Sequence, residues 1–115
     1  YDLGLEWVEL TGLPMVFAVW AVKNLAAYPN LPMHFADSAD YGRQHLDDIV
    51  ALESEKRNLP PELVSRYLQE HTSFDLGEQE QHGLATFLRS AAELGLVGPL
   101  TDLAYLEEPA VAEQE

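Results

Sequence analysis

The chain has 115 residues, of which 47% are hydrophobic, so it is long and apolar enough to build a folded core. Its net charge of −14, with only six Lys and Arg residues, excludes sequence-independent binding to nucleic acid and disfavours anionic membranes, because both need clustered basic side chains. It has no cysteine, which excludes disulfides and thiolate metal sites and permits a reducing compartment.

The first predicted element is a short helix over residues 2–12. Asp2 can accept hydrogen bonds from the unpaired amides of the first turn, and Gly12 can take the left-handed conformation that ends a helix. We expect this helix to lead directly into the segment that follows.

Residues 13–22 form the most informative stretch, because both alternating faces are apolar. One face carries Met15, Phe17, Val19 and Ala21, and the other carries Val16, Ala18, Trp20 and Val22. This pattern, rich in β-branched and aromatic residues, predicts a strand buried on both faces of a parallel sheet. Such a strand needs hydrogen-bonding neighbours, and no second run of this kind follows. We therefore expect the chain to be a piece of a larger fold.

A buried helix is the alternative for this stretch, since apolar character continues through residues 25–28 and periodicity alone does not separate the two for short runs. A membrane span is not expected, because Lys23 and Asn24 close the run well short of the ~20 apolar residues that a bilayer requires.

A turn is predicted over residues 28–32, because each proline disfavours helix in the residue before it. One long helix then follows, from near Pro32 to near Arg57, and Asn58 can end it. Its inner face comprises Phe35, Ala39, Gly42, Leu46, Ile49, Val50 and Glu53.

A shorter helix is predicted to begin at Pro61 and to run to about Gln69. Residues 75–78 have the pattern of a capping box, in which the side chains of Asp75 and Glu78 bind each other's amides at a helix start.

The helix that begins there is predicted to stop at Gly95. We expect residues 1–97 to form the folded part and residues 98–115 to form an acidic C-terminal tail.

Histidines pair with acids one helical turn away at three places, which are His34 with Asp37, His45 with Asp48, and Glu78 with His82. No set supplies three ligands, so we predict no metal site. No nucleophile, acid and base arrangement or phosphate-binding loop is present either, and the catalytic residues stay unknown.

A loop between a helix end and a buried strand is where ligands commonly bind in α/β proteins, which favours Thr11 and Gly12 as substrate-binding residues. Phe17 is predicted to join them. With Trp7, Trp20 and Tyr41 it is one of the large side chains that line a pocket or pack in a core.

The start of the chain resembles the signature of the MqnA-type chorismate dehydratases of the MqnA/MqnD family, which act in the futalosine route to menaquinone. The matching residues are Asp2-Leu3-Gly4, Glu6-Trp7, Thr11-Gly12-Leu13-Pro14 and Val16-Phe17-Ala18-Val19-Trp20-Ala21, followed by Leu59-Pro60-Pro61-Glu62-Leu63 and Phe74-Asp75-Leu76-Gly77-Glu78 where C-terminal helices are expected. The similarity covers residues 1 to about 97.

The resemblance implies an α/β protein with two lobes like a type 2 periplasmic binding protein. This chain would be its C-terminal part, mostly helical with one buried strand near the lobe junction, and the N-terminal remainder of the same protein would be its partner. The resemblance further implies cytoplasmic dehydration of chorismate to 3-[(1-carboxyvinyl)oxy]benzoate without a cofactor. No catalytic residue of the family can be carried over onto this chain.

Three alternatives stay open at this point. The chain resembles, less closely, the MqnD-type enzyme of the same pathway, which acts later on a cyclic futalosine derivative. It is also compatible with a solute-binding protein that captures a small anion between two lobes. Lastly, it is compatible with a complete α-helical interaction module in which residues 13–22 form a central helix.

Overall fold

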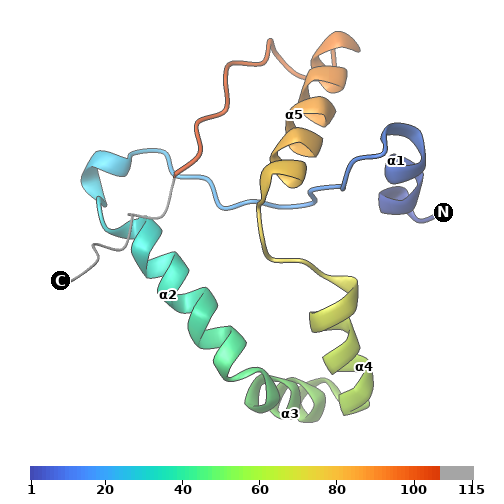
Figure 1. Cartoon of the computed structure of the whole chain (residues 1–115), viewed down its shortest axis with the longest axis vertical. Helices are drawn as coiled ribbons and strands as arrows, with labels where there is room; N and C mark the ends of the chain where they lie inside the picture. The colour runs from blue at the N-terminus through green and yellow to red at the C-terminus, as the bar shows by residue number, and fades with distance from the viewer. Residues whose placement is uncertain (107–115) are drawn as a thin grey trace. The chain divides into compact units, whose positions relative to one another are not determined.

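The computed structural model describes residues 1–106 (Figure 1). These residues fall into two compact units. The first unit combines Tyr1–Ala21 with Phe74–Tyr105, and the second contains Val22–Ser73. Every regular element in the described residues is helical, which confirms the prediction of a mostly helical chain.

Helix α1 (Leu3–Thr11) opens the first unit and has the predicted ends. The Asp2 carboxylate accepts hydrogen bonds from the amides of Gly4 at 3.0 Å and Leu5 at 3.1 Å. Gly12 follows with a φ of 71°, and its N–H donates to the Val8 carbonyl at 2.7 Å. Both predicted caps are therefore confirmed.

The predicted buried strand over residues 13–22 is not confirmed. This stretch, the blue segment after α1 in Figure 1, is neither strand nor helix, so the buried-helix alternative is wrong as well. Phe17 and Trp20 are 75% and 83% exposed. The physical reason is that a strand exists only as part of a hydrogen-bonded ladder, and no neighbouring strand is present in the described residues.

Helix α5 (Glu78–Glu93) begins later than predicted. Its N-cap is Gly77, so Glu78 is the first helical residue and cannot occupy the third position of a capping box, and the prediction at Asp75 is wrong. Glu78 and Glu80 in the first turn still favour this start through the helix dipole. The predicted stop at Gly95 is confirmed, because Gly95 has a φ of 69° just past the helix end.

Helix α5 packs on the segment that follows α1, and the contact is made at Gly83, which is buried. A Cβ atom at residue 83 would overlap the Pro14 carbonyl oxygen and would lie 3.7 Å from the Leu13 Cβ. One turn further along α5, the Phe87 ring meets the Trp7 ring edge to face, with 5.5 Å between centroids and 73° between planes. These contacts hold α1, residues 13–14 and α5 together.

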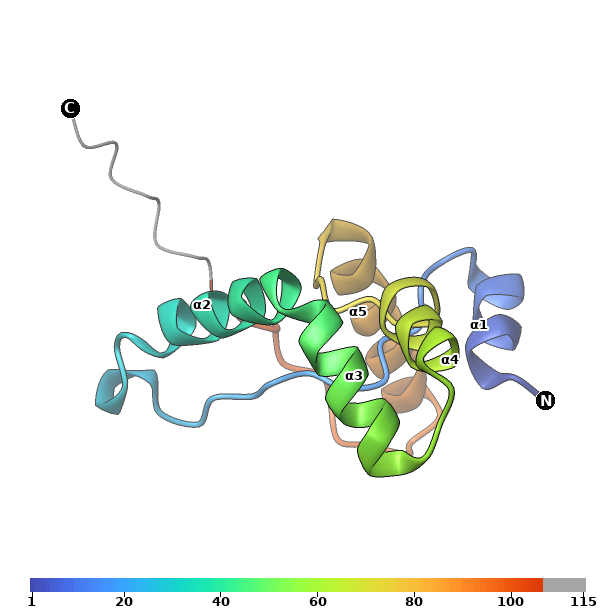
Figure 2. The ribbon, with the colours of Figure 1, turned by 90° about the horizontal axis from the view of Figure 1, so that it is seen from below.

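The second unit begins with a short 3-10 helix, η1 (Leu25–Ala27), and continues with α2 (Leu31–Gln44) and α3 (Leu46–Arg57). The single long helix predicted over this region is wrong, because His45 leaves helical geometry with φ −112° and ψ 25°. The His45 ring stacks on the Tyr41 ring at 3.9 Å, and its Nδ1 lies 2.8 Å from the Tyr41 carbonyl. Figure 2 shows the change of direction between the two helices.

Helix α4 (Pro61–Arg66) follows α3 after the turn at Asn58, whose φ is 53°, so the predicted stop at Asn58 and start at Pro61 are both confirmed. A π-helix, η2 (Tyr67–His71), extends α4. Among the described residues the buried side chains are those of Ser54 on α3 and Val64 on α4, at 6% and 8% exposure. The second unit is therefore centred on the packing of α3 against α4.

Replacing Gly83 with alanine tests the packing of α5. Alanine favours a helix by about 1 kcal/mol over glycine, but the added Cβ would meet the Pro14 carbonyl. We expect Gly83→Ala to lower the free energy of unfolding by about 1–3 kcal/mol, measured by urea denaturation.

Gly42→Ala on α2 is the matched control, because its Cβ would meet no atom within 4 Å. This change is expected to raise stability by about 0.5–1 kcal/mol. Equal effects of the two substitutions would show that α5 does not approach Pro14 closely.

Candidate functional site

Thr11 organises the turn that connects α1 to the apolar segment of residues 13–22, which is half-buried up to Val16 and exposed from Phe17 onward. Its hydroxyl donates to the Trp7 carbonyl at 2.8 Å and accepts from the Leu13 amide at 3.2 Å. The hydroxyl proton is thus used inside the turn, and one lone pair of the oxygen remains for a further donor. In this geometry Thr11 can accept a hydrogen bond from a ligand while it fixes the path of the backbone.

Gly12 is the exposed residue of this turn. No atom lies within 4 Å of the position that a Cβ would take, so the turn is open on this side. Its φ of 71° is one that residues with a side chain rarely adopt. Gly12 therefore combines a surface position with a backbone conformation that a larger residue would strain.

Phe17 lies away from Thr11 and Gly12. A Cβ at Gly4, in the first turn of α1, would lie only 3.2 Å from the Phe17 Cζ. Thr11 ends the same helix, and a nine-residue helix is about 13 Å long. The structure thus brings Thr11 and Gly12 together and places Phe17 at the opposite end of α1.

Gly83, which lets α5 approach this turn, is not among the site residues predicted from the sequence. Gly83 carried a usable signal, because a glycine inside a helix costs about 1 kcal/mol relative to alanine and often marks a close backbone approach. Trp7, which is expected to line a pocket or to pack in a core, packs on Phe87. Its indole Nε1 is buried and has no hydrogen-bond partner within residues 1–106.

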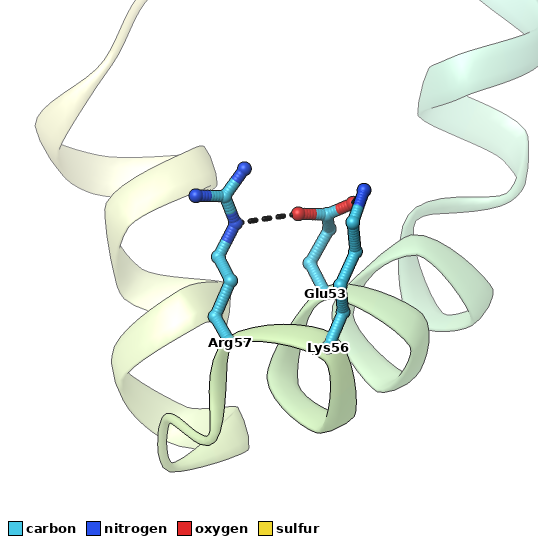
Figure 3. Close-up of polar contacts among 3 residues, drawn as sticks. All are labelled: Glu53, Lys56 and Arg57. Atoms are coloured by element: carbon cyan, nitrogen blue, oxygen red, sulfur yellow. Dashed lines mark hydrogen bonds and ion pairs between the residues drawn. The ribbon is translucent and has the colours of Figure 1, made fainter.

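A cluster of ion pairs joins three side chains on α3 (Figure 3). The Glu53 carboxylate lies 2.6 Å from the Arg57 Nε and 3.7 Å from the Lys56 Nζ. The hydrogen bond from Arg57, ahead of the charge of Lys56, lowers the pKa of Glu53 below its ordinary value of 4.5. A carboxylate held ionised in this way is a poor proton donor at neutral pH.

No three His, Asp or Glu side chains within residues 1–106 lie close enough together to hold a metal ion. None of the helices found there combines the length and the apolar character that crossing a bilayer requires.

Replacing Thr11 with valine tests its role in the turn. Valine keeps the shape of the side chain but removes both hydrogen bonds, so we expect the free energy of unfolding to fall by about 1–2 kcal/mol. Thr11→Ser keeps the hydroxyl and should cost less than Thr11→Val in the same urea titration. A valine variant as stable as the parent would show that these hydrogen bonds do not hold the turn.

The pKa of Glu53 gives a prediction on pH. The pKa of Glu53 is lowered in the folded state. The ion pair therefore stabilises the folded protein fully at pH values above the ordinary carboxyl pKa, and this stabilisation is lost as the pH falls through the folded-state pKa. We expect the NMR titration midpoint of the Glu53 carboxyl to rise in Arg57→Ala, and to rise less in Lys56→Ala. An unchanged midpoint in Arg57→Ala would contradict the assigned cause.

Comparison with known proteins identifies the family to which this chain belongs. The profile of a family described as "Menaquinone biosynthesis" matches residues 1–93. A chorismate dehydratase from Thermus thermophilus is 31% identical over 107 residues, which cover 92% of this chain and 37% of that protein. No solved structure matches the chain.

The match to the family profile runs from α1 through the last helical residue of α5, so it includes the turn at Thr11 and Gly12 and the helix that packs on it. The chain therefore belongs to the menaquinone biosynthesis family.

Proposed function

We propose that the protein containing this chain dehydrates chorismate to 3-[(1-carboxyvinyl)oxy]benzoate. The observation that carries this proposal is the 31% identity, over 92% of the chain, to a protein named chorismate dehydratase. Membership of the menaquinone biosynthesis family supports the same pathway role. The proposed enzyme is a carbon–oxygen lyase that acts in the cytoplasm on a small dianionic substrate.

The chain spans about 37% of the length of the relative that it matches. We therefore propose that it is the C-terminal part of a two-lobed protein resembling type 2 periplasmic binding proteins. The remainder of that protein is then its partner, and supplies the second lobe and the groups that this chain lacks.

The proposed reaction removes a ring proton and the hydroxyl group from chorismate, so that one molecule of water leaves and the ring becomes aromatic. A base must take the proton, and donors must hold the substrate carboxylates. The sequence identifies no catalytic base among the Asp and Glu side chains of the described residues, and the Glu53 carboxylate forms an ion pair with Arg57. We assign the base to the remainder of the protein.

The turn at Thr11 and Gly12 is the proposed contribution of this chain to substrate binding. Thr11 can accept a hydrogen bond from the substrate hydroxyl, and the open side of Gly12 allows a close approach to the backbone. Phe17 joins this site only where residues 13–22 take another path in the longer protein, because in this chain it lies at the other end of α1. We propose these roles from the positions of the three residues along α1 and from the chemistry of their side chains and backbone.

Incubating the full-length protein with chorismate tests the proposal, with products followed by mass spectrometry. The expected result is loss of one water from the substrate. Binding of chorismate without loss of water would favour a solute-binding protein instead. Inertness toward chorismate, with activity on a cyclic futalosine derivative, would favour the MqnD-type reaction.

The contribution of Phe17 is separable from general destabilisation by a matched pair of variants. Phe17→Ala is expected to raise the KM for chorismate about tenfold, equivalent to about 1.4 kcal/mol of binding. Phe74→Ala is the control, because Phe74 is similarly exposed at 71% and lies outside the proposed site. An equal KM in the two variants would remove Phe17 from the site.

A further inference from the structure

We propose that Phe87 is a positioning residue for Thr11, the threonine that we assign to substrate binding. This inference rests on the proposed function, and it adds a residue of α5 to the site at the end of α1. Phe87 does not touch the substrate in this proposal. It acts through Trp7, which lies between Phe87 and the turn.

The hydroxyl of Thr11 joins two separate pieces of backbone. It donates to the Trp7 carbonyl inside α1 at 2.8 Å and accepts from the Leu13 amide beyond the turn at 3.2 Å. These two bonds leave one lone pair of the oxygen for the substrate. The direction of that lone pair therefore depends on where the Trp7 carbonyl and the Leu13 amide lie relative to each other.

Helix α5 holds both of these pieces of backbone. Its Gly83 lies against the carbonyl of Pro14, the residue that follows Leu13. Four residues later, on the same face of α5, the Phe87 ring meets the Trp7 ring with 5.5 Å between centroids. One helix therefore holds both hydrogen-bond partners of the hydroxyl.

The contact with Phe87 matters because α1 has few other anchors. The half-buried residues of α1 are Gly4, Trp7 and Thr11, and its other residues are exposed. Of these three, Trp7 alone has a large side chain. Its indole Nε1 is buried and forms no hydrogen bond in the described part of the chain, so packing orients the ring. Removal of the Phe87 ring therefore allows α1, and Thr11 with it, to shift.

Variants of the full-length protein acting on chorismate test this inference. Phe87→Leu keeps an apolar side chain but removes the ring, and it is expected to raise the KM about fivefold, the effect of weakening one hydrogen bond to the substrate. The kcat is expected to change by less than about twofold, because the bond forms when the substrate binds. Phe87→Tyr keeps the ring and is expected to keep the parental KM.

Two controls separate positioning from a general loss of stability. In a Thr11→Val background the hydroxyl is absent, so Phe87→Leu is expected to change the KM by less than about twofold. Val64→Ala removes apolar volume from the contact between α3 and α4, in the second unit, and is expected to leave the KM unchanged. A rise of about fivefold in either control would overturn the inference.

Amide hydrogen exchange, resolved by residue with NMR, gives a readout that needs no turnover. Weakening of the bond between the Leu13 amide and Thr11 is expected to speed exchange at Leu13 about fivefold in Phe87→Leu, and not in Phe87→Tyr. The Gly12 amide is the internal reference, because its bond to the Val8 carbonyl lies within the helix cap. Unchanged exchange at Leu13 in Phe87→Leu would contradict the positioning role.

The positioning role and the proposed function fail separately. Faster exchange at Leu13 in a protein that does not dehydrate chorismate would refute the proposed function and leave Thr11 positioned by Phe87. Dehydration of chorismate, with an unchanged KM and unchanged exchange in Phe87→Leu, would refute the positioning role alone.

Discussion

The close approach of α5 to the backbone at Pro14 is the constraint on which the first unit depends. It is possible only because residue 83 is glycine, since a Cβ would overlap the Pro14 carbonyl. The approach places Phe87 against Trp7 and so joins α5 to α1. The turn at Thr11 is then held from within by its hydroxyl and from outside by the two helices.

Several helix ends are predictable from the sequence because interactions within a few residues decide them, although the capping box expected at Asp75 does not form. Asp2 accepts nearby amides, and Gly12, Asn58 and Gly95 adopt positive φ, all through interactions within a few residues. The break at His45 was not predictable in this way, because an uninterrupted polar and apolar periodicity runs through it. It depends on how the imidazole stacks on Tyr41, which periodicity does not encode.

The candidate site was predictable in part. Thr11 and Gly12 are adjacent, so their joint position in a turn followed from the helix end alone. The position of Phe17 depends on the direction in which residues 13–22 leave the turn. Alternation of side chains predicts which residues share a face of a strand, but it does not predict the direction of the strand. The exposure of residues 17–22 has a similar origin: burial of a strand depends on neighbouring strands, and the described residues contain none.

The central claim is that contact between α1 and α5 holds the first unit together, and a double-mutant cycle on Trp7 and Phe87 tests it most directly. The free energy of unfolding would be measured for Trp7→Leu, Phe87→Leu and the double variant. The edge-to-face geometry predicts a coupling energy of about 0.5–1.5 kcal/mol. Additivity within about 0.3 kcal/mol would show that the two rings do not interact and would contradict the account.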